Sequence, residues 1–331
     1  MTETTVRIIK NWDFPDLMRQ SPGGLGVWDG VRFFEGEGAA DYVVVLNQPA
    51  VPVTVTAARN RVFAIIQEPP TRYHRYLHAG QPAFGRIYMT DPQLVTSRLA
   101  GTTPRHIGSQ PALAWHAGLD FDTLAAMTDV PPKSRDVSWI TSTLSFLPGH
   151  KLRLRSIEAL QAAGLVDFYG RGLKPIERKW DGLAPYRYSI AFENHIGPWY
   201  WSEKLADCFL AGAMPIYAGC SNLEDYFPAG SFVRLDPNSA DVAGDVRRVV
   251  ESDLAERNRH LVLEARRRVL YEHQLFPFVV AKIKADRDAP EPAAPLTLKV
   301  RGISNPAVYG MAVWHWKVAP MLRAARSRFA P

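Results

Sequence analysis

The amino-acid sequence predicts an α/β fold in two domains, each built on a parallel β-sheet. Its 331 residues exceed what one hydrophobic core usually organises, so two domains of about 150 residues each are expected. Short β-branched runs alternate with segments long enough for helices, which is typical of layered α/β domains. A proline-rich break at residues 131–133, just before a new strand-like run, indicates a domain boundary near residue 134.

The composition is that of a globular protein. With 47% hydrophobic and 22% charged residues the chain can build two cores, and no apolar run approaches the roughly 20 residues that a membrane-spanning helix needs. The first residues carry no basic stretch followed by an apolar segment, so no secretion signal is expected and the predicted compartment is the cytoplasm. The two cysteines, Cys208 and Cys220, are expected to be buried thiols.

The first domain is predicted to cover residues 1–134. Four β-branched runs are expected to be its parallel strands, with crossover helices in the segments between them. These runs are VRII near residue 6 and residues 41–47, 61–67 and 85–90.

The second domain is predicted to cover residues 135–285. Its elements follow a β-α-β-α-β order, which is the pattern of a doubly wound parallel sheet. Residues 240–275 have apolar residues at helical spacing and are expected to form one or two long surface helices. The expected strands are 137–142, 165–170, 186–194 and 214–219, and the expected helices between them are 151–164 and 202–212.

Residues 286–331 are predicted to be a linker followed by a basic aromatic tail. Beyond Glu291 the chain has six basic residues and no acidic one, and these six account for the whole net charge of +6. Such a composition favours an anionic surface, so peripheral association with the inner membrane is expected and binding of nucleic acid is not. The tail residues that carry this argument are Lys299, Arg301, Trp314, Trp316, Lys317, Met321, Leu322, Arg323, Arg326, Arg328 and Phe329.

The loop after residues 186–194 gives the strongest indication of a binding site. Ligands of open parallel sheets bind beyond the carboxyl ends of strands, and this loop gathers polar and aromatic residues just before a helix. Ser202 is expected to cap that helix, whose free N–H groups suit a phosphate. Lys204 would add an ammonium in the first turn, a position that opposes the helix dipole unless an anion is bound. The alternative is a solvated Lys204 paired with Glu203.

The segment from Tyr186 to Asp236 resembles the donor-binding region of the family 10 fucosyltransferases, the α1,3/α1,4-fucosyltransferases. That family has an apolar strand ending in F-E-N, then Y-x-T-E-K, a-G-x-x-P-(V/I)-x-x-G and F-x-P-x-S-F. VDFYGRGL is also similar to the family's V-D-x-x-G strand and loop, so the resemblance covers about residues 139–236. His195 replaces the family's usual serine, and Ser202 its threonine. The matching segments are FEN at 192–194, YWSEK at 200–204, AGAMPIYAG at 211–219, YFPAGSF at 226–232 and VDFYGRGL at 166–173.

The resemblance implies a GT-B type glycosyltransferase, in which two Rossmann-like domains face each other across a cleft. It also implies an inverting reaction and no essential metal ion. Lys204 would contact the diphosphate of the donor and Glu203 its ribose hydroxyls. Tyr200 and Asn194 would contact the diphosphate-sugar part, and Glu193 the sugar or the ribose.

Ser202 and Arg153 complete the donor-binding residues that the resemblance implies. Arg153 lies in the helix after the strand at 137–142, where the family keeps a phosphate-binding arginine. Its neighbours Lys151 and Arg155 leave the register open by two residues, and the alternative for Arg153 is an ordinary solvated helix residue. Negative charge builds on the diphosphate as it departs, and Arg153, Lys204 and the helix N-terminus could stabilise it without a divalent ion.

Glu68 is the candidate general base. An inverting transfer needs a base for the acceptor hydroxyl proton, and Glu68 follows the apolar strand RVFAIIQ, with Pro69 and Pro70 fixing the next loop. The resemblance agrees, because the family's proposed base is a glutamate after a strand that begins R-V-F, although QEPP replaces the usual G-E-N. The alternative is that Glu68 only solvates the strand end; the next candidates are Asp16, Asp29 and Asp91.

These features predict an enzyme that transfers fucose from GDP-fucose to a glycan or glycolipid hydroxyl, in the synthesis of bacterial surface polysaccharide or lipopolysaccharide. No cofactor or divalent metal is expected. His74 and His78 stand four apart, but HRYLH lacks a glutamate after the first histidine, so a surface role is expected for both. The alternatives are a related transferase that uses another nucleotide sugar and a non-catalytic protein that binds sugar nucleotides or glycans.

Overall fold

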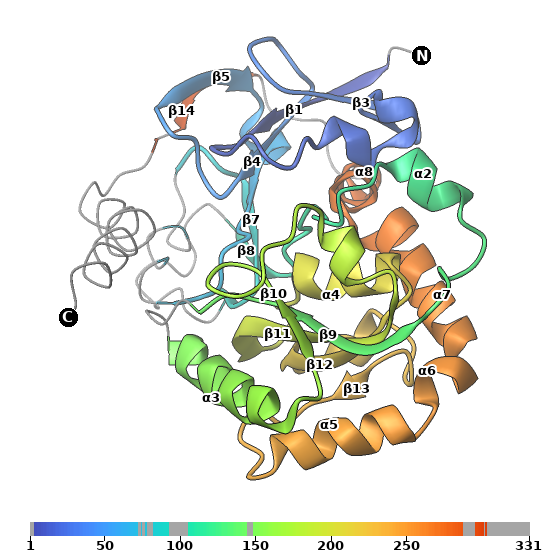
Figure 1. Cartoon of the computed structure of the whole chain (residues 1–331). Coiled ribbons are helices and arrows are strands. Elements are labelled where there is room, and N and C mark those ends of the chain that lie inside the picture. Colours follow the sequence, from blue (N-terminus) through green and yellow to red (C-terminus); the bar gives the residue numbers. More distant parts are fainter. Residues whose placement is uncertain are drawn as a thin grey trace, which may run out of the picture.

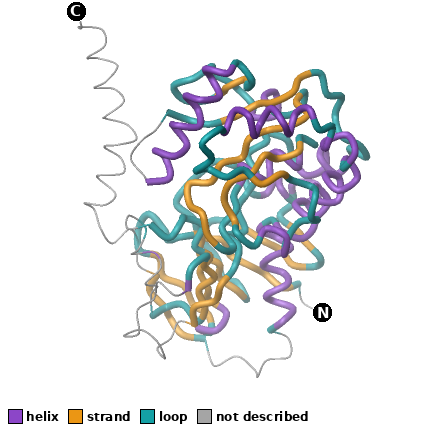
Figure 2. The backbone as a smooth tube through the Cα atoms, turned by 90° about the horizontal axis from the view of Figure 1, so that it is seen from below, coloured by secondary structure: helices purple, strands orange, loops and turns teal. Residues whose placement is uncertain are grey.

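A computed structural model of the chain describes residues 3–71, 74, 77, 82–92, 105–143, 148–286, 295–300 and 302. These residues form two large β-sheets, one above the other in Figure 1, each with its own hydrophobic core, and a third sheet of two strands. Helices surround the second sheet, whereas strands and loops make up most of the first domain (Figure 2). No helix among the described residues is long and apolar enough to cross a membrane.

The first sheet has seven strands in the order β2-β3-β1-β4-β6-β7-β8. All neighbouring pairs are parallel except β2 and β3, which run antiparallel. The four strands predicted from β-branched runs are confirmed as β1, β4, β6 and β7. The strands are β1 (Thr4–Ile9), β2 (Val27–Trp28), β3 (Val31–Phe34), β4 (Tyr42–Leu46), β6 (Val62–Ile65), β7 (Arg86–Met89) and β8 (Arg105–Gly108).

The prediction of crossover helices is wrong for the first two connections of this sheet. The chain passes from β1 to β4 through two 3-10 turns, β2 and β3, and from β4 to β6 through β5 (Val53–Ala57). The first connection is rich in glycine, and Gly23, Gly24, Gly26 and Gly30 all have positive φ, a conformation that no α-helix contains. One face of this sheet is covered by β5 paired with β14 (Leu296–Val300).

The second sheet has five parallel strands in the order β10-β9-β11-β12-β13. Every strand and helix predicted up to residue 220 is present, and β11 extends three residues beyond the predicted end. The elements are β9 (Arg135–Ile140), α3 (Pro148–Ala163), β10 (Asp167–Tyr169), β11 (Tyr186–Gly197), α4 (Glu203–Leu210), β12 (Met214–Cys220) and β13 (Val233–Arg234).

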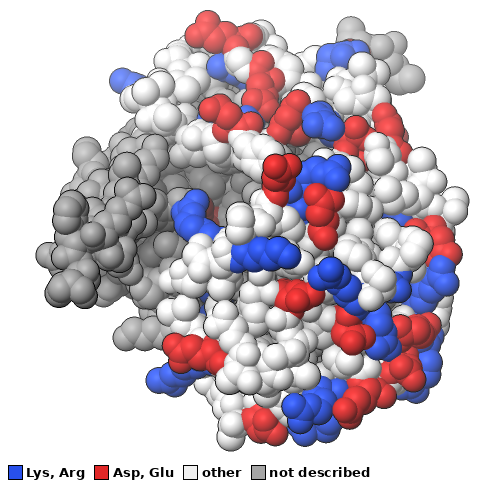
Figure 3. Space-filling view, viewed as in Figure 1, with Lys and Arg blue, Asp and Glu red and all other residues white. Residues whose placement is uncertain are grey.

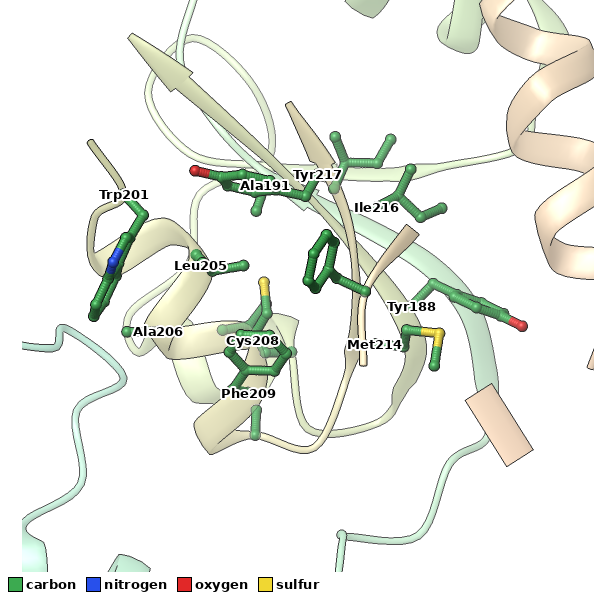
Figure 4. Packing of buried hydrophobic residues seen from close by; sticks show 14 of the residues in the cluster. Tyr188, Ala191, Trp201, Leu205, Ala206, Cys208, Phe209, Met214, Ile216 and Tyr217 are labelled. Atoms are coloured by element: carbon green, nitrogen blue, oxygen red, sulfur yellow. The ribbon is translucent and has the colours of Figure 1, made fainter. Parts of the chain in front are cut away.

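Helix α4 packs its apolar side against the second sheet. Six of its eight residues are buried, and Gly212 with φ of +65° follows its last turn, as the sequence predicted. Both cysteines are buried free thiols. Figure 4 shows the interface, where side chains of α4 lie beside those of the strands; the labelled residues include Leu205, Cys208, Phe209, Met214, Ile216 and Tyr217.

Residues 242–285 form a chain of short helices rather than one or two long ones. Asp241 accepts a hydrogen bond from Gly244 N and caps α5, and Asp253 in the left-handed region breaks the run after it. The elements are α5 (Val242–Glu251), α6 (Leu254–Arg257), α7 (Arg259–Arg268), the π-turn η7 (Val269–His273) and α8 (Leu275–Ala285).

The chain returns to the first domain after η7. Helix α8, which the sequence analysis placed in the second domain, buries Phe276, Val279 and Ile283 in the core of the first sheet. Strand β14 then pairs with β5, and Lys299 lies on it. The rest of the basic aromatic tail lies outside the described residues. Charges of both signs are interspersed over the face seen in Figure 3.

Candidate functional site

The carboxyl ends of both sheets meet at the domain junction. Trp199, in the loop after β11, has φ of +62°, and its ring lies so close to the end of β8 that a Cβ added to Gly108 would be 2.9 Å away. Charges also act across the junction, because Asp91 beyond β7 influences the pKa of His195, and Glu68 beyond β6 influences that of Tyr200. Open α/β sheets bind their ligands beyond the carboxyl ends of the strands, so the domain junction is the expected binding site.

Arg153 and Asn194 meet at the switch point of the second sheet, between β9 and β11. The Arg153 guanidinium donates to Asn194 Oδ1 (3.2 Å) and to Ser142 Oγ (3.5 Å). Arg153 is 5% exposed, whereas Arg155 is exposed on the other side of α3. Burial lowers the pKa of Arg153 to about 10. The structure thus identifies Arg153, rather than Arg155, as the arginine at this site.

The N-terminus of α4 is fixed by a buried carboxylate. Glu193 accepts hydrogen bonds from Ser202 N (2.8 Å) and Ser202 Oγ (2.6 Å), and its side chain is fully buried. Ser202 is the N-cap, as predicted, and accepts from Lys204 N (3.3 Å). Gly219 of β12 leaves room for Glu193, since a Cβ there would lie 2.4 Å from its Cγ. Glu193 therefore fixes the position of Ser202 and, with it, the start of α4.

Lys204 is held among oxygen acceptors at this helix end. Its ammonium lies 3.0 Å from Ser202 Oγ, 3.3 Å from Glu203 Oε1 and 3.5 Å from Glu193 Oε2, with the side chain 24% exposed. Burial disfavours the ammonium, but Glu203 and Glu193 raise the pKa of Lys204 above its ordinary value. The expected ion pair with Glu203 is present, but both side chains are largely buried, so neither is merely solvated.

Burial and charge set opposite pKa shifts for the two glutamates. Burial raises the pKa of Glu193, and Lys204 only partly opposes this. Burial also disfavours ionised Glu203, but Lys204 and Lys179 outweigh it and hold the pKa of Glu203 well below its usual range. Glu203 is thus a fixed anion beside the helix end, and Glu193 is a buried anchor.

Tyr200 lies beneath the surface of the loop. It is 3% exposed, burial raises its pKa, and its ring meets His195 edge-on at 5.8 Å between centroids. The structure therefore places Arg153 beside Asn194, and Lys204 beside Glu203 at the N-terminus of α4. Glu193, Ser202 and Tyr200 are buried.

Glu68 lies just beyond β6 with its side chain 46% exposed. Asn47, at the end of β4, accepts from Gln67 N (2.7 Å) and Glu68 N (3.3 Å) and so fixes the loop. His74 Nε2 lies 3.5 Å from Glu68 Oε2, while His74 Nδ1 lies 3.2 Å from Pro69 O. Glu68 is thus an accessible carboxylate, as a general base must be, and it lies beside the imidazole of His74.

Sequence reasoning missed several supporting residues. Lys179 contacts two acidic residues of α4, His74 contacts Glu68, and Asn47 holds the Glu68 loop. The FEN and EK motifs pointed to one strand and one helix, whereas Lys179 and Asn47 lie in other loops with no motif of their own. His74 was expected to have a surface role and was not linked to Glu68. Only the position of Asn47 directly after an apolar strand gave a usable signal.

The sequence also contains two Asp-x-Asp triplets, at residues 120–122 and 286–288, and only the first lies wholly within the described residues. Asp120 caps α2 (Phe121–Ala126) by accepting from Thr123 N, and Asp122 accepts from Gly23 N. Both carboxylates therefore hold local backbone. The described residues contain no group of three or more His, Cys, Asp or Glu side chains arranged to hold a metal ion.

Comparison of solved structures supports the fold class. A DNA-modifying β-glucosyltransferase superposes with a TM-score of 0.50 over 84% of this chain and 99% of its own, at 9% identity. An α1,3-fucosyltransferase solved with GDP gives a TM-score of 0.47 at 16% identity, covering 86% of this chain and 90% of that one. The fold is the GT-B architecture of glycosyltransferases, with two Rossmann-like domains.

Sequence comparison confirms the family resemblance. Residues 130–256 match the C-terminal domain of glycosyltransferase family 10 (fucosyltransferase). A 4-galactosyl-N-acetylglucosaminide 3-α-L-fucosyltransferase of Pongo pygmaeus is 35% identical over 109 residues, 31% of this chain and 30% of that protein. A 3-galactosyl-N-acetylglucosaminide 4-α-L-fucosyltransferase of Homo sapiens is also 35% identical, over 31% of this chain and 29% of its own. The matched segment thus spans about a third of these relatives.

Proposed function

We propose that this protein is an inverting glycosyltransferase that moves fucose from GDP-fucose to a hydroxyl of a glycan or glycolipid, in the manner of an α1,3/α1,4-fucosyltransferase. The observation that carries the proposal is the ammonium of Lys204 at the N-terminus of α4, inside the segment that matches the family. A helix N-terminus and a lysine are suited to a diphosphate. Arg153 lies at the neighbouring switch point.

The residues can be given roles in a displacement reaction. Glu68 accepts the proton of the acceptor hydroxyl while that oxygen attacks the anomeric carbon from the face opposite the diphosphate. The bond from sugar to phosphate breaks, and GDP leaves with the negative charge that develops. Lys204, Arg153 and the N–H groups of α4 stabilise this charge, which is why no divalent ion is included in the proposal. Glu203 accepts from the ribose hydroxyls.

The first experiment is release of GDP from GDP-fucose in the presence of a panel of glycan acceptors, with and without a chelator. We expect acceptor-dependent release that the chelator does not reduce. Lys204→Ala should lower turnover by about thirtyfold to a thousandfold, since a preorganised charge contributes roughly 2–4 kcal/mol to the transition state. Lys174→Ala, an exposed lysine of the same domain, is the matched control.

Different outcomes point to the alternatives. Turnover with another GDP- or UDP-linked sugar, but none with GDP-fucose, would indicate a related transferase. Donor binding without turnover on any acceptor would favour a non-catalytic sugar-nucleotide protein. If Lys204→Ala left donor affinity and turnover unchanged, the assignment of the donor site to the N-terminus of α4 would be wrong.

The basic aromatic tail gives this proposal a membrane partner. Each basic residue near an anionic surface contributes about 1 kcal/mol of binding, so the tail would hold the enzyme at the inner leaflet where surface polysaccharide or lipopolysaccharide precursors are made. Deletion of residues 312–331 should abolish binding to anionic liposomes. Unaltered liposome binding, or loss of folding in the truncated protein, would favour a tail helix packed on the protein instead.

A further inference from the structure

A second half-buried lysine contacts the same end of α4 as Lys204. Lys179 lies in the turn η5 (Lys179–Gly182), between β10 and β11, and its side chain is 26% exposed. Its ammonium lies 2.9 Å from Asp207 Oδ2 and 4.0 Å from Glu203 Oε1. Glu203 and Asp207 are four residues apart and so share one face of α4, where two carboxylates without a cation would repel each other.

Lys179 contacts only one of the two carboxylate oxygens of Asp207, Oδ2. Asp207 Oδ1 accepts from His116 N (2.7 Å), which ties α4 to the segment that enters the domain junction. The Asp207 side chain is 2% exposed, so the contact with Lys179 also neutralises a buried charge. A purely structural role for Lys179 would end there.

The contacts of Glu203 indicate more than neutralisation. Lys179 and Lys204 both approach Oε1 of Glu203, at 4.0 Å and 3.3 Å. Oε2 makes no hydrogen bond to any part of the chain that the structure describes, although the side chain is only 18% exposed. Two ammonium groups therefore hold one oxygen of the carboxylate and leave the other able to accept from a ligand hydroxyl.

We propose that Lys179 is a positioning residue of the donor site: it orients the Glu203 carboxylate so that Oε2 accepts from the ribose hydroxyls of the nucleotide. This inference rests on the proposed function, because it takes the donor to be a nucleoside diphosphate sugar. It adds a residue from outside the matching motifs and assigns it a measurable part in recognition of the ribose.

The test compares binding of GDP and 2′,3′-dideoxy-GDP, which lacks both ribose hydroxyls. Hydrogen bonds to a charged group contribute roughly 1.5–3 kcal/mol, so the unmodified protein should prefer GDP by about tenfold or more. Lys179→Met should lower this preference to about twofold or less by weakening GDP alone. Arg178→Met removes a neighbouring charge that pairs with exposed Asp181 and should keep the preference.

A second pair of variants separates positioning from neutralisation. Asp207→Asn removes the buried charge, and the double variant Lys179→Met/Asp207→Asn then differs from it by Lys179 alone. The inference expects both to unfold at similar temperatures, but only the double variant to lose the preference for ribose hydroxyls. Lys179→Arg keeps a cation beside both carboxylates and should restore it.

The outcomes are distinct. If the double variant retains the preference of Asp207→Asn, or unfolds where Asp207→Asn does not, Lys179 has a structural role and the inference is wrong. If the unmodified protein does not bind GDP at all, the proposed function fails instead. Binding of GDP without any preference for the ribose hydroxyls would remove Glu203 from ribose recognition, and Lys179 with it.

Discussion

At the scale of single residues, the site depends on charges placed at the ends of strands and helices. Arg153 is buried at the switch point, whereas Arg155 two residues later is exposed. We expect Arg153→Ala to lower turnover of GDP-fucose by about a hundredfold or more, because one charge on the departing diphosphate is lost. Arg155→Ala should stay within about twofold. Equal effects of the two substitutions on kcat/KM would contradict the assignment.

Glu68 gives a second prediction at this scale. Glu68→Gln keeps the shape of the side chain but cannot accept a proton, so turnover should fall by on the order of a hundredfold while donor affinity is unchanged. Glu35→Gln, at an exposed carboxylate that pairs with Lys10, is the control in the same domain. Steady-state kinetics and GDP binding separate the two effects. Near-normal turnover in Glu68→Gln would direct attention to Asp16, Asp29 or Asp91.

At the scale of elements, strand β12 must leave space for the anchor of α4. Gly219 has ordinary φ, so only packing excludes a larger residue: an added Cβ would lie 2.4 Å from Glu193 Cγ and 2.4 Å from the Tyr217 hydroxyl. We expect Gly219→Ala to destabilise the protein by about 1–3 kcal/mol and to weaken GDP binding, because Glu193 must move. Urea unfolding and GDP titration measure these effects.

A second glycine provides the comparison. Gly164 has φ of +64° with open space around it, so Gly164→Ala should cost about 1 kcal/mol through backbone strain alone and leave GDP binding intact. If Gly219→Ala binds GDP as well as the unmodified protein, the buried Glu193 is not what fixes the N-terminus of α4.

The elements also show what sequence patterns can and cannot predict. Apolar β-branched runs such as 42–46 gave the strands, since a strand buried on both faces needs such residues. The N-cap Ser202 and the stop at Gly212 followed from local backbone chemistry. Helix α8 was not predicted: its residues were only assigned to the second domain, and a helix that is apolar on most sides does not reveal which sheet it covers. Lys179 was missed because its partners are brought near only by the fold.

At the scale of the whole molecule, Lys133 attaches the proline-rich segment between the two domains, residues 131–133, to the second domain. Its ammonium donates to Ala184 O (2.9 Å) and Ala211 O (2.8 Å), and burial lowers its pKa to about 7. The pKa of a lysine in the unfolded chain is about 10.4. Between these values the unfolded chain binds a proton that the folded chain has released, so this residue makes stability rise with pH.

Lys133→Met tests this dependence because methionine does not titrate. The difference in unfolding free energy between the unmodified protein and Lys133→Met should grow in favour of the unmodified protein from about pH 7 to about pH 10. Urea unfolding at several pH values in this range gives the measurement. A difference that stays constant with pH would mean that Lys133 remains charged in the folded linker.

The return of α8 and β14 to the first sheet affects the order in which the protein can be assembled during translation. The core of the second domain is drawn from Trp115 to Leu270, a single uninterrupted stretch, whereas the first domain needs residues from both ends of the chain. A nascent chain that has left the ribosome only as far as residue 274 therefore lacks the segments that cover both faces of the first sheet. The later domain in the sequence should become protease-resistant first, which ribosome-bound chains of increasing length can show.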